Sequence, residues 1–200
     1  MKIRTAIVFL ALVSAPGAMA QTASTDLAKA QGGTFTMDKR HTRLIFSYNH
    51  LGFSTSYGLF NEPAGTLHFD PANPSASTLD VTVKLDGIDT TVPELDDALK
   101  SPKFFDVAKY PMATFKSTGI KVTGPTSGTI SGDLTVHGVT KPVTLDASFN
   151  GAGANPANRY VAGFNASGHL KRSDFGLGAL TPMVSDDVTL TISAEFDRAQ

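Results

Sequence analysis

Five histidines are the residues of this 200-residue chain best suited to bind a metal or move a proton. They are His41, His50, His68, His137 and His169. They stand singly, with no His-x-His or His-Glu-x-x-His spacing, and the chain has no Cys that could supply a thiolate. Because a metal site needs several such ligands at suitable spacing, the pattern predicts no metal site.

Nucleophilic and acid–base chemistry also lack their usual arrangements. The chain has no Gly-x-Ser-x-Gly elbow and no Ser-x-x-Lys pair. Two carboxylate pairs, Asp96-Asp97 and Asp186-Asp187, are neighbours in sequence. Neighbouring side chains on a helix or strand point in different directions, so we expect these carboxylates to be solvated. We assign no catalytic residue and interpret the chain as a protein that is not an enzyme.

The charge balance argues against two large classes of partner. Lys and Arg number 17 and Asp and Glu number 18, which gives a net charge of -1. A nearly neutral chain has no general attraction to nucleic acid or to anionic membranes. No segment after residue 20 is apolar over the length that a membrane-spanning helix needs.

The first 20 residues have the three parts of a secretory signal peptide. Lys2 and Arg4 give a positive start, residues 6–13 form a short apolar run, and Ala18-Met-Ala20 is a small-x-small cleavage signal. The apolar run is well short of the ~20 residues that a membrane anchor needs. We therefore expect cleavage near Ala20 and a periplasmic or secreted mature protein.

Alternation of apolar and polar residues dominates the mature chain. In one segment Leu79, Val81, Val83 and Leu85 fall on one face, with polar residues on the other. A period of two with a single apolar face is typical of antiparallel strands. The pattern predicts about eight strands, near residues 43–50, 65–70, 79–85, 113–122, 130–136, 143–149, 160–170 and 188–196.

We expect one domain over residues 34–200, preceded by a loose arm over residues 21–33 that lacks any apolar period. The predicted fold is all-β, a single antiparallel lipocalin-like barrel with one short helix. Thr91-Val-Pro-Glu94 has the spacing of a capping box and Ser101-Pro102 should end the helix. Its inward face would then cover one end of the sheet with Leu95, Ala98 and Leu99.

A barrel of eight strands either fills its interior with side chains or holds one small ligand. Leu44, Phe46, Tyr48 and His50 alternate along one predicted strand and form an inward apolar row. The chain also has 13 Phe, four Tyr and no Trp, a bias towards aromatic surface without polar groups. The pattern alone leaves both a solid core and a ligand cavity open.

Five ordered blocks of the sequence resemble the YceI-like family of polyisoprenoid-binding proteins. They are DKRHTRLIFSYNHLGFS with YGLF (38–60), LKSPKFFDVAKYP (99–111), ATFKST (113–118), GDLTVHGVTKPV (132–143) and KRSDFG (171–176). The resemblance implies a lipocalin-like barrel, usually periplasmic, with a hydrophobic tunnel for a long isoprenoid or fatty chain and no catalytic residues. One departure is Asn49, which stands where the family usually has a basic residue before the His.

We therefore expect a bound lipid and no other cofactor. The predicted lining residues are Leu44, Phe46, Tyr48, His50, Phe53, Phe60, Phe69, Phe105, Phe115, Phe164 and Phe175. Arg172 and Asp174 form either a local ion pair that shapes a turn or a polar rim of the tunnel. His50 is either a core histidine bonded to a backbone carbonyl or a contact for the ligand's head group.

Three functions are compatible with these features. We favour an exported carrier that holds a polyisoprenoid, an isoprenoid quinone or a fatty-acid-like chain for storage, transport or stress protection. An envelope protein-interaction module would instead need an exposed apolar patch. An enzyme acting on a bound lipid would depend on His50. The expected partner is the long-chain lipid, without nucleic acid, and the sequence is compatible with a homodimer.

Overall fold

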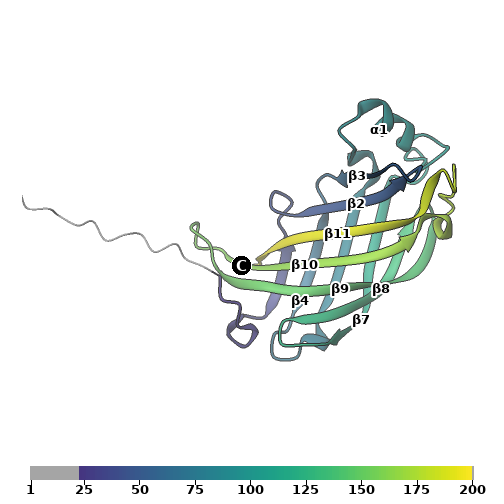
Figure 1. Ribbon diagram of the computed structural model, residues 1–200. Helices are drawn as coiled ribbons and strands as arrows, with labels where there is room; N and C mark the ends of the chain where they lie inside the picture. The colour runs from purple at the N-terminus through teal and green to yellow at the C-terminus, as the bar shows by residue number, and fades with distance from the viewer. Residues whose placement is uncertain (1–22, 200) are drawn as a thin grey trace, which may run out of the picture.

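The computed structural model describes residues 23–199, most of which belong to β-strands (Figure 1). The strands are β1 (Gly33–Met37), β2 (Arg43–His50), β3 (Ser54–Phe60), β4 (Ala64–Phe69), β5 (Thr78–Lys84), β6 (Ile88–Asp89), β7 (Met112–Val122), β8 (Ser127–Val136), β9 (Val139–Ala154), β10 (Tyr160–Lys171) and β11 (Val184–Arg198). The described α-helix is α1 (Pro93–Lys100), and short 3-10 helices lie at Leu27–Lys29, Pro74–Ala76, Leu85–Gly87 and Arg172–Phe175. The predicted signal peptide and its cleavage point lie outside the described residues.

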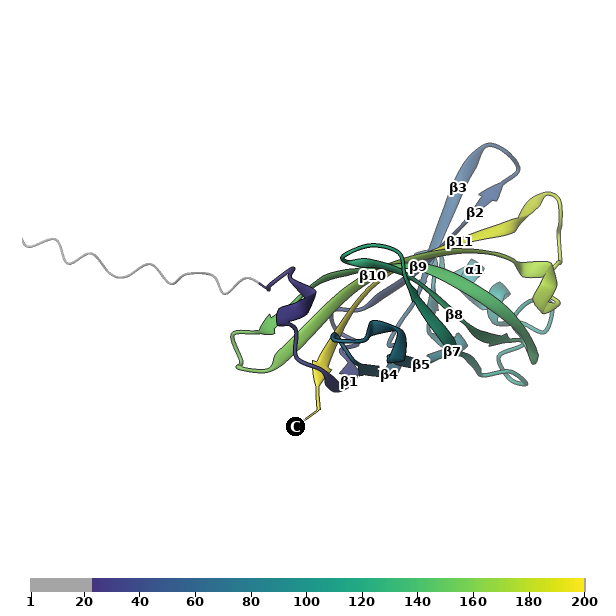
Figure 2. The ribbon, with the colours of Figure 1, turned by 90° about the horizontal axis from the view of Figure 1, so that it is seen from below.

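Eight strands close into a barrel in the order β1-β4-β5-β7-β8-β9-β10-β11, and β11 returns to β1 (Figures 1 and 2). All of these pairings are antiparallel. Closure gives each of these eight strands a hydrogen-bonding neighbour on both sides. The predicted all-β barrel is therefore confirmed.

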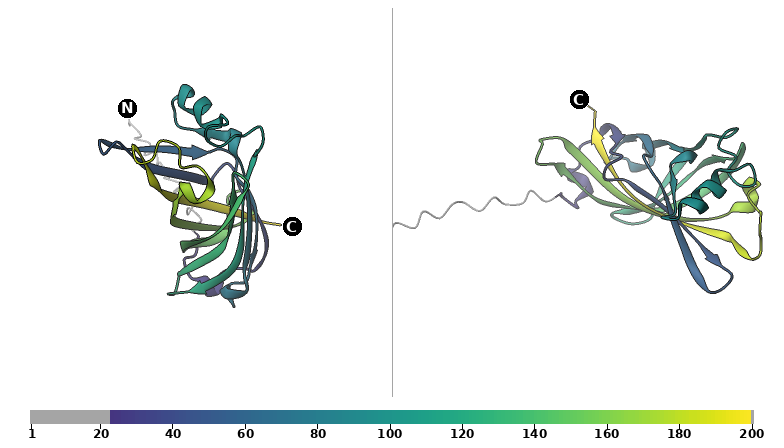
Figure 3. Two further views of the ribbon diagram at one scale, coloured as in Figure 1. Left: turned by 90° about the vertical axis from the view of Figure 1, so that its right-hand side faces the viewer. Right: turned by 90° about the horizontal axis from the view of Figure 1, so that it is seen from above.

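Strand β11 joins the barrel to a smaller extension of the sheet. Its residues 196–198 pair with β1, whereas its residues 188–193 pair with β2. β3 pairs with β2, and the short β6 pairs with β3. The β2–β3 hairpin therefore leaves the wall of the barrel and projects from it at one end (Figures 2 and 3).

Each of the eight predicted strand segments corresponds to a strand, although β9 and β11 are much longer than predicted. The sequence did not indicate β1, β3 or the two-residue strand β6. In β1, Phe35 is the one fully buried side chain, and β3 begins with the polar run Ser54-Thr-Ser56. Both strands are specified by their partners in the sheet more than by an apolar period of their own.

Residues 23–30 are not the loose arm that the sequence predicted. Ser24 and Ala152 exchange two backbone hydrogen bonds, each 2.9 Å long. Asp26 caps the first 3-10 helix by accepting a hydrogen bond from the N–H of Ala28 (3.1 Å). Leu27 packs against the buried cluster around Phe35. This segment therefore belongs to the barrel and covers part of one end.

Helix α1 lies where predicted but is not held by the predicted capping box. Its N-cap is Val92, and Thr91 has a φ of 64°, which takes its side chain out of capping position. The Asp96 carboxylate accepts hydrogen bonds from both the N–H and the hydroxyl of Thr90, each 2.7 Å long. A contact from within the helix to the preceding segment therefore replaces the N-cap bond.

The inner face of α1 is narrower than predicted. Leu95 and Leu99 point into the interior of the barrel, whereas Ala98 is exposed. The helix covers the end of the barrel near β3, as Figure 1 shows. Among residues 23–199, no helix has the length and hydropathy needed to cross a membrane.

A buried carboxylate fixes the turn between β1 and β2. The side chain of Asp38 is only 7% exposed and accepts hydrogen bonds from the N–H of Arg40 (2.9 Å), the Arg40 Nε (3.3 Å) and the His41 Nδ1 (2.9 Å). Burial alone would raise the pKa of Asp38, but these hydrogen bonds and the Arg40 charge hold it well below its usual range. The Asp38 N–H also donates to the carbonyl of Glu195 on β11 (2.8 Å), which anchors the turn near the point where β11 changes partner.

We predict that Asp38→Asn lowers the free energy of unfolding at neutral pH by about 1–3 kcal/mol, because an amide accepts these charge-assisted hydrogen bonds poorly. A folded-state pKa below the unfolded value of 3.8 means that the carboxylate stabilises the protein above that pH and loses this contribution as the pH falls. The difference between wild type and variant, measured by urea unfolding, should therefore shrink below about pH 4. Asp174→Asn, at an exposed carboxylate, is the control, and a difference independent of pH would contradict the prediction.

Candidate functional site

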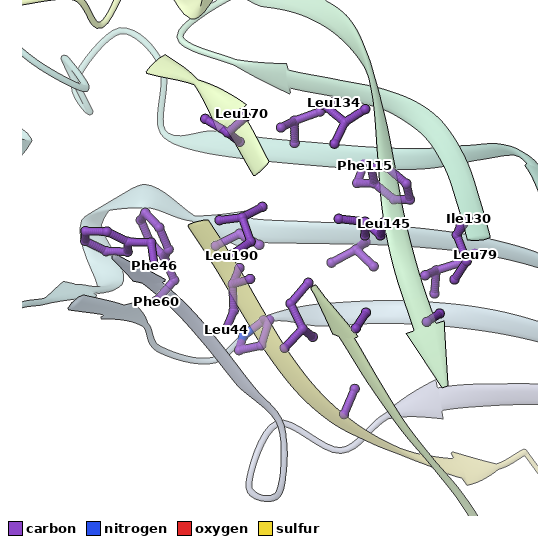
Figure 4. A pocket seen from close by; sticks show the side chains of 18 of the residues that line it. Leu44, Phe46, Phe60, Leu79, Phe115, Ile130, Leu134, Leu145, Leu170 and Leu190 are labelled. Carbon is purple, nitrogen blue, oxygen red and sulfur yellow. The ribbon is translucent and has the colours of Figure 1, made fainter. Parts of the chain in front are cut away.

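A cavity of about 650 Å³ runs through the interior of the barrel. Its walls come from barrel strands on all sides, together with β2, β3 and α1. In Figure 4 the labelled side chains from opposing strands face one common space without filling it. The volume lies within the range of about 300–1,000 Å³ that is typical of small-molecule sites. The structure therefore resolves the question that the sequence left open, in favour of a hollow barrel.

Aliphatic and aromatic side chains form most of the lining, and the remainder is mainly Ser and Thr. Arg172 is the only Lys, Arg, Asp or Glu among the described residues of the wall. Within residues 23–199 no group of three or more His, Cys, Asp or Glu is arranged to hold a metal ion. The central wall consists of Leu79, Val81, Val83, Phe115, Ile130, Leu134, Leu145, Leu170, Leu190 and Ile192.

Aromatic rings stack along the part of the wall formed by β2 and β3. Phe46 and Tyr48 are stacked with their ring centroids 6.3 Å apart, and Phe46 lies 5.4 Å from Phe60. Phe60 in turn meets Phe105 edge-on at 5.9 Å. The Phe46 ring fits because Gly58 lies opposite it, where an added Cβ would come within 2.3 Å of the Phe46 Cζ. A side chain at position 58 would therefore push this ring out of its place in the cavity wall.

A second group of rings narrows the opposite end of the cavity. Phe164 meets Phe69 edge-on at 5.5 Å and lies 5.5 Å from Phe149 and 6.0 Å from Phe196. Behind them Phe35 is fully buried. The most closely packed part of the interior is thus at the end covered by residues 23–30, and the hollow part extends from there towards the β2–β3 hairpin.

Polar side chains line the cavity at more than one place. Thr126, Ser127, Ser148 and Asn165 lie near the β7–β8 hairpin, and a second group lies at the end near the β2–β3 hairpin, called the mouth below. His50 lines the cavity there but is exposed to solvent. The interpretation of His50 as a core histidine is therefore wrong, while its contact with a ligand head group stays a prediction. Tyr48 and Ser56 are paired across β2 and β3 and also line the cavity. Their phenol and hydroxyl groups therefore lie next to His50, further from the hairpin tip.

All but one of the predicted lining residues do line the cavity. They are Leu44, Phe46, Tyr48, His50, Phe60, Phe69, Phe105, Phe115, Phe164 and Phe175. Phe53 is the exception, since its side chain is 88% exposed and lies outside the cavity. It follows a tight turn in which Leu51 and Gly52 have φ values of 54° and 75°, so the alternation of β2 does not continue to it.

The predicted ion pair between Arg172 and Asp174 does not form. The Arg172 guanidinium instead donates hydrogen bonds to the backbone carbonyls of Leu177 and Ala179 (2.7 Å) and the hydroxyl of Thr181 (3.0 Å) in the loop before β11. It also donates to the carbonyls of Val184 and Ser185, the first residues of β11 (2.8 Å each). Asp174 is exposed and is not part of the cavity wall. Arg172 thus lies on the cavity wall, as expected for a residue of a polar rim. Its N–H groups, however, bond to the loop and to the start of β11.

Sequence reasoning missed the wall that comes from α1 and the segment after it. Leu95, Leu99 and Phe104 line the cavity near the mouth. The spacing of the two leucines did indicate an inward face, but nothing in the pattern indicated that this face would meet the cavity. The aliphatic wall of β5, β8 and β9 could have been found, because the alternation already placed those residues on the inner face.

We predict that Arg172→Met loosens the loop before β11, because it leaves several loop carbonyls without a donor. The free energy of unfolding should fall by about 2–3 kcal/mol. Hydrogen exchange at the backbone amides of Leu177 and Val184, which donate to the carbonyls of Arg172 and Leu180, should become faster. Lys171→Met, at the exposed neighbouring residue, should change neither measurement. Equal exchange in wild type and Arg172→Met would contradict the prediction.

Known proteins resemble this chain in sequence over most of its length. The YceI-like domain matches residues 35–196. A UPF0312 protein of Pectobacterium atrosepticum is 42% identical over 178 residues, which cover 89% of this chain and 92% of the relative. The crystal structure of a Campylobacter jejuni YceI protein is 33% identical, with a TM-score of 0.69 over 76% of this chain and 90% of that protein.

A more distant solved structure shares the fold. It is a polyisoprenoid binding domain from Saccharophagus degradans implicated in plant cell wall breakdown, with a TM-score of 0.63 at 15% identity. The match covers 84% of this chain and the whole of that domain. At this identity the likeness shows the fold alone, whereas the match over residues 35–196 and the relatives above 30% identity show the family. The chain belongs to the YceI-like family.

Proposed function

We propose that this protein is exported and carries one long apolar lipid of isoprenoid type inside its barrel. The observation that carries the proposal is the apolar cavity of about 650 Å³. Among the described residues its wall contains a single charged side chain, that of Arg172, whose N–H groups donate to backbone carbonyls and a hydroxyl. Membership of the YceI-like family, and the isoprenoid binding named for the Saccharophagus degradans domain, favour an isoprenoid over other apolar chains.

The size of the cavity suits a chain molecule. A methylene occupies roughly the volume of a water molecule, about 30 Å³, so the cavity has room for on the order of twenty carbon atoms. Each buried methylene contributes about 0.8 kcal/mol, and ten of them give about 8 kcal/mol before ordering costs. Affinity can therefore come from apolar burial, without a charged anchor.

The polar groups at the mouth favour a neutral head group at that end. His50, Tyr48 and Ser56 offer an imidazole, a phenol and a hydroxyl. None of these three groups carries a fixed positive charge that would balance a phosphate, and the N–H groups of the nearby Arg172 donate to backbone carbonyls and a hydroxyl. An isoprenoid alcohol or an isoprenoid quinone therefore suits the mouth better than a prenyl phosphate does.

We propose binding without turnover. Catalysis on a bound lipid would need an acid–base pair or a nucleophile with its base facing the cavity. Among the described lining residues His50 is the sole imidazole, and no carboxylate joins it on the wall. A long-lived complex that releases an unaltered lipid is the expected behaviour.

Export is proposed on the composition of the N-terminal segment. Residues 1–20 combine a positive start, an apolar run and a small-x-small signal. A periplasmic or secreted carrier would keep an apolar chain out of water during storage or transport. The absence of Cys agrees with a domain held together by its sheet and its packing alone.

We predict that Leu190→Trp blocks lipid uptake by filling the cavity. Leu190 points into the hollow from β11 (Figure 4), so a larger side chain finds space and should leave the thermal midpoint nearly unchanged. Protein stripped of lipid should bind a fluorescent isoprenol at least about tenfold more weakly than wild type, a loss of about 1.4 kcal/mol.

The matched control for this experiment is Thr191→Trp. Thr191 is the next residue of β11, faces the other side of the strand and is exposed. This variant should bind the isoprenol as wild type does. Equal binding by Leu190→Trp and Thr191→Trp would contradict a site inside the barrel, and the absence of binding by wild type would contradict the proposed function.

A further inference from the structure

An exposed apolar surface lies beside the mouth of the cavity. It consists of Leu51 and Phe53 at the tip of the β2–β3 hairpin, and Leu180 and Met183 in the loop before β11. We call these four residues the mouth patch. Their exposed fractions are 48%, 88%, 41% and 55%, respectively. Single exposed apolar residues are ordinary on protein surfaces, but a group of four beside one opening indicates an interaction site.

The two segments of the mouth patch are held together by the backbone. The N–H of Leu51 donates to the carbonyl of Met183 (2.9 Å), and His50 pairs with Val184. Figures 1 and 2 show the hairpin tip and the loop before β11 side by side at the same end of the barrel. Arg172 donates hydrogen bonds to the carbonyl of Ala179 in this loop and to that of Val184 at the start of β11, which holds the loop in place. The patch is therefore presented on a preformed support.

The backbone at two of the four residues has an unusual conformation. Leu51 and Leu180 have φ values of 54° and 67°, in the left-handed region that favours Gly, Asn or Asp. A leucine there is both conformationally costly and exposed to water. Because both costs occur together at two residues of the mouth patch, we infer that the exposed leucine side chains have a role in binding.

The segments that carry the mouth patch have no formal charge. No Asp, Glu, Lys or Arg occurs between Arg43 and Glu62, or between Asp174 and Asp186. A surface of this kind loses no ionic hydration when it enters an apolar layer. It also has no cationic group that would select anionic lipids, so it is complementary to a neutral or zwitterionic surface.

The mouth patch is continuous with the cavity. His50, Leu180 and Val184 belong to the cavity wall, and Leu180 belongs to both the wall and the patch. The β2–β3 hairpin projects beyond the barrel, so its tip can reach a surface before the body of the protein does (Figure 3). An apolar molecule that leaves such a surface would meet the cavity opening without passing through water.

We propose that the mouth patch docks on the surface of a zwitterionic lipid bilayer, with Phe53 and Met183 inserted among the lipids, so that cargo passes directly between bilayer and cavity. This inference rests on the proposed lipid-carrying function. The projecting shape and the continuity with the cavity favour a bilayer over a second copy of the chain, which would need a flat, self-complementary face.

The test is co-flotation of full-length mature protein with phosphatidylcholine vesicles. Wild type should float with the vesicles, and the double variant Phe53→Ser/Met183→Ser should partition at least about tenfold more weakly, because two inserted apolar side chains are lost. Raising the salt concentration should change the vesicle binding of wild type by less than about twofold, because no formal charge takes part. Adding phosphatidylglycerol to the vesicles should have an equally small effect.

The control is Val92→Ser. Val92 is also 46% exposed, but it belongs neither to the mouth patch nor to the cavity wall. It should float as wild type does. Failure of wild type to float, or equal flotation of the double variant, would overturn the proposal. Self-association that depends on the patch, without flotation, would also overturn it in favour of a dimer interface.

Loading measurements separate this inference from the proposed function. The double variant should take up an isoprenol presented in dilute detergent as wild type does, but should extract it from vesicles more slowly. Slow uptake from detergent as well would show that the substitutions damage the cavity. A second double variant, Phe53→Trp/Met183→Leu, keeps the apolar surface and should float with the vesicles as wild type does. Loss of flotation by this variant would contradict docking. No uptake by wild type from either source would instead refute the carrier function itself.

Discussion

Closure of the sheet by the pairing of β1 with β11 is the constraint on which the cavity depends. It fixes eight strands around one axis, and at that circumference inward side chains can line the interior without meeting. The hollow of about 650 Å³ follows from this geometry together with the residues of the wall, most of which are aliphatic or aromatic. An apolar chain that fills it gains both removal from water and dispersion contacts with the wall.

The period-two pattern predicted the barrel because most of its strands have one buried and one solvated face. It failed at β1 and β3, where few apolar residues alternate and the neighbouring strands specify the pairing. The alternation of inward and outward side chains also failed to place Phe53. Two residues with left-handed backbone conformation in the turn after β2 break the alternation, which holds only up to His50. These limits have one physical origin: side-chain patterning reports the face of a strand, while turns and pairing partners are set by contacts distant in sequence.

Polar contacts were harder to predict than the apolar wall. Sequence proximity suggested an ion pair between Arg172 and Asp174, but backbone carbonyls of the following loop compete successfully for the guanidinium. The Thr91–Glu94 spacing suggested a capping box, yet Asp96 bonds to Thr90 instead. Whether a barrel of this size is solid or hollow could not be decided from the pattern, because it depends on how far opposing side chains reach. The resemblance to the YceI-like family supplied that expectation.

The mouth combines the features that are not explained by stability alone: the exposed imidazole of His50, the uncharged hairpin and the loop held by Arg172.

The most direct test of a lipid-filled barrel is mass spectrometry of the protein purified from its native host without detergent. The protein would be measured intact under native conditions and again after solvent extraction. A single added mass per chain, released by solvent and identified as an isoprenoid, is the predicted result. Protein that is reproducibly free of any apolar compound, and that stays so after incubation with isoprenols, would contradict it.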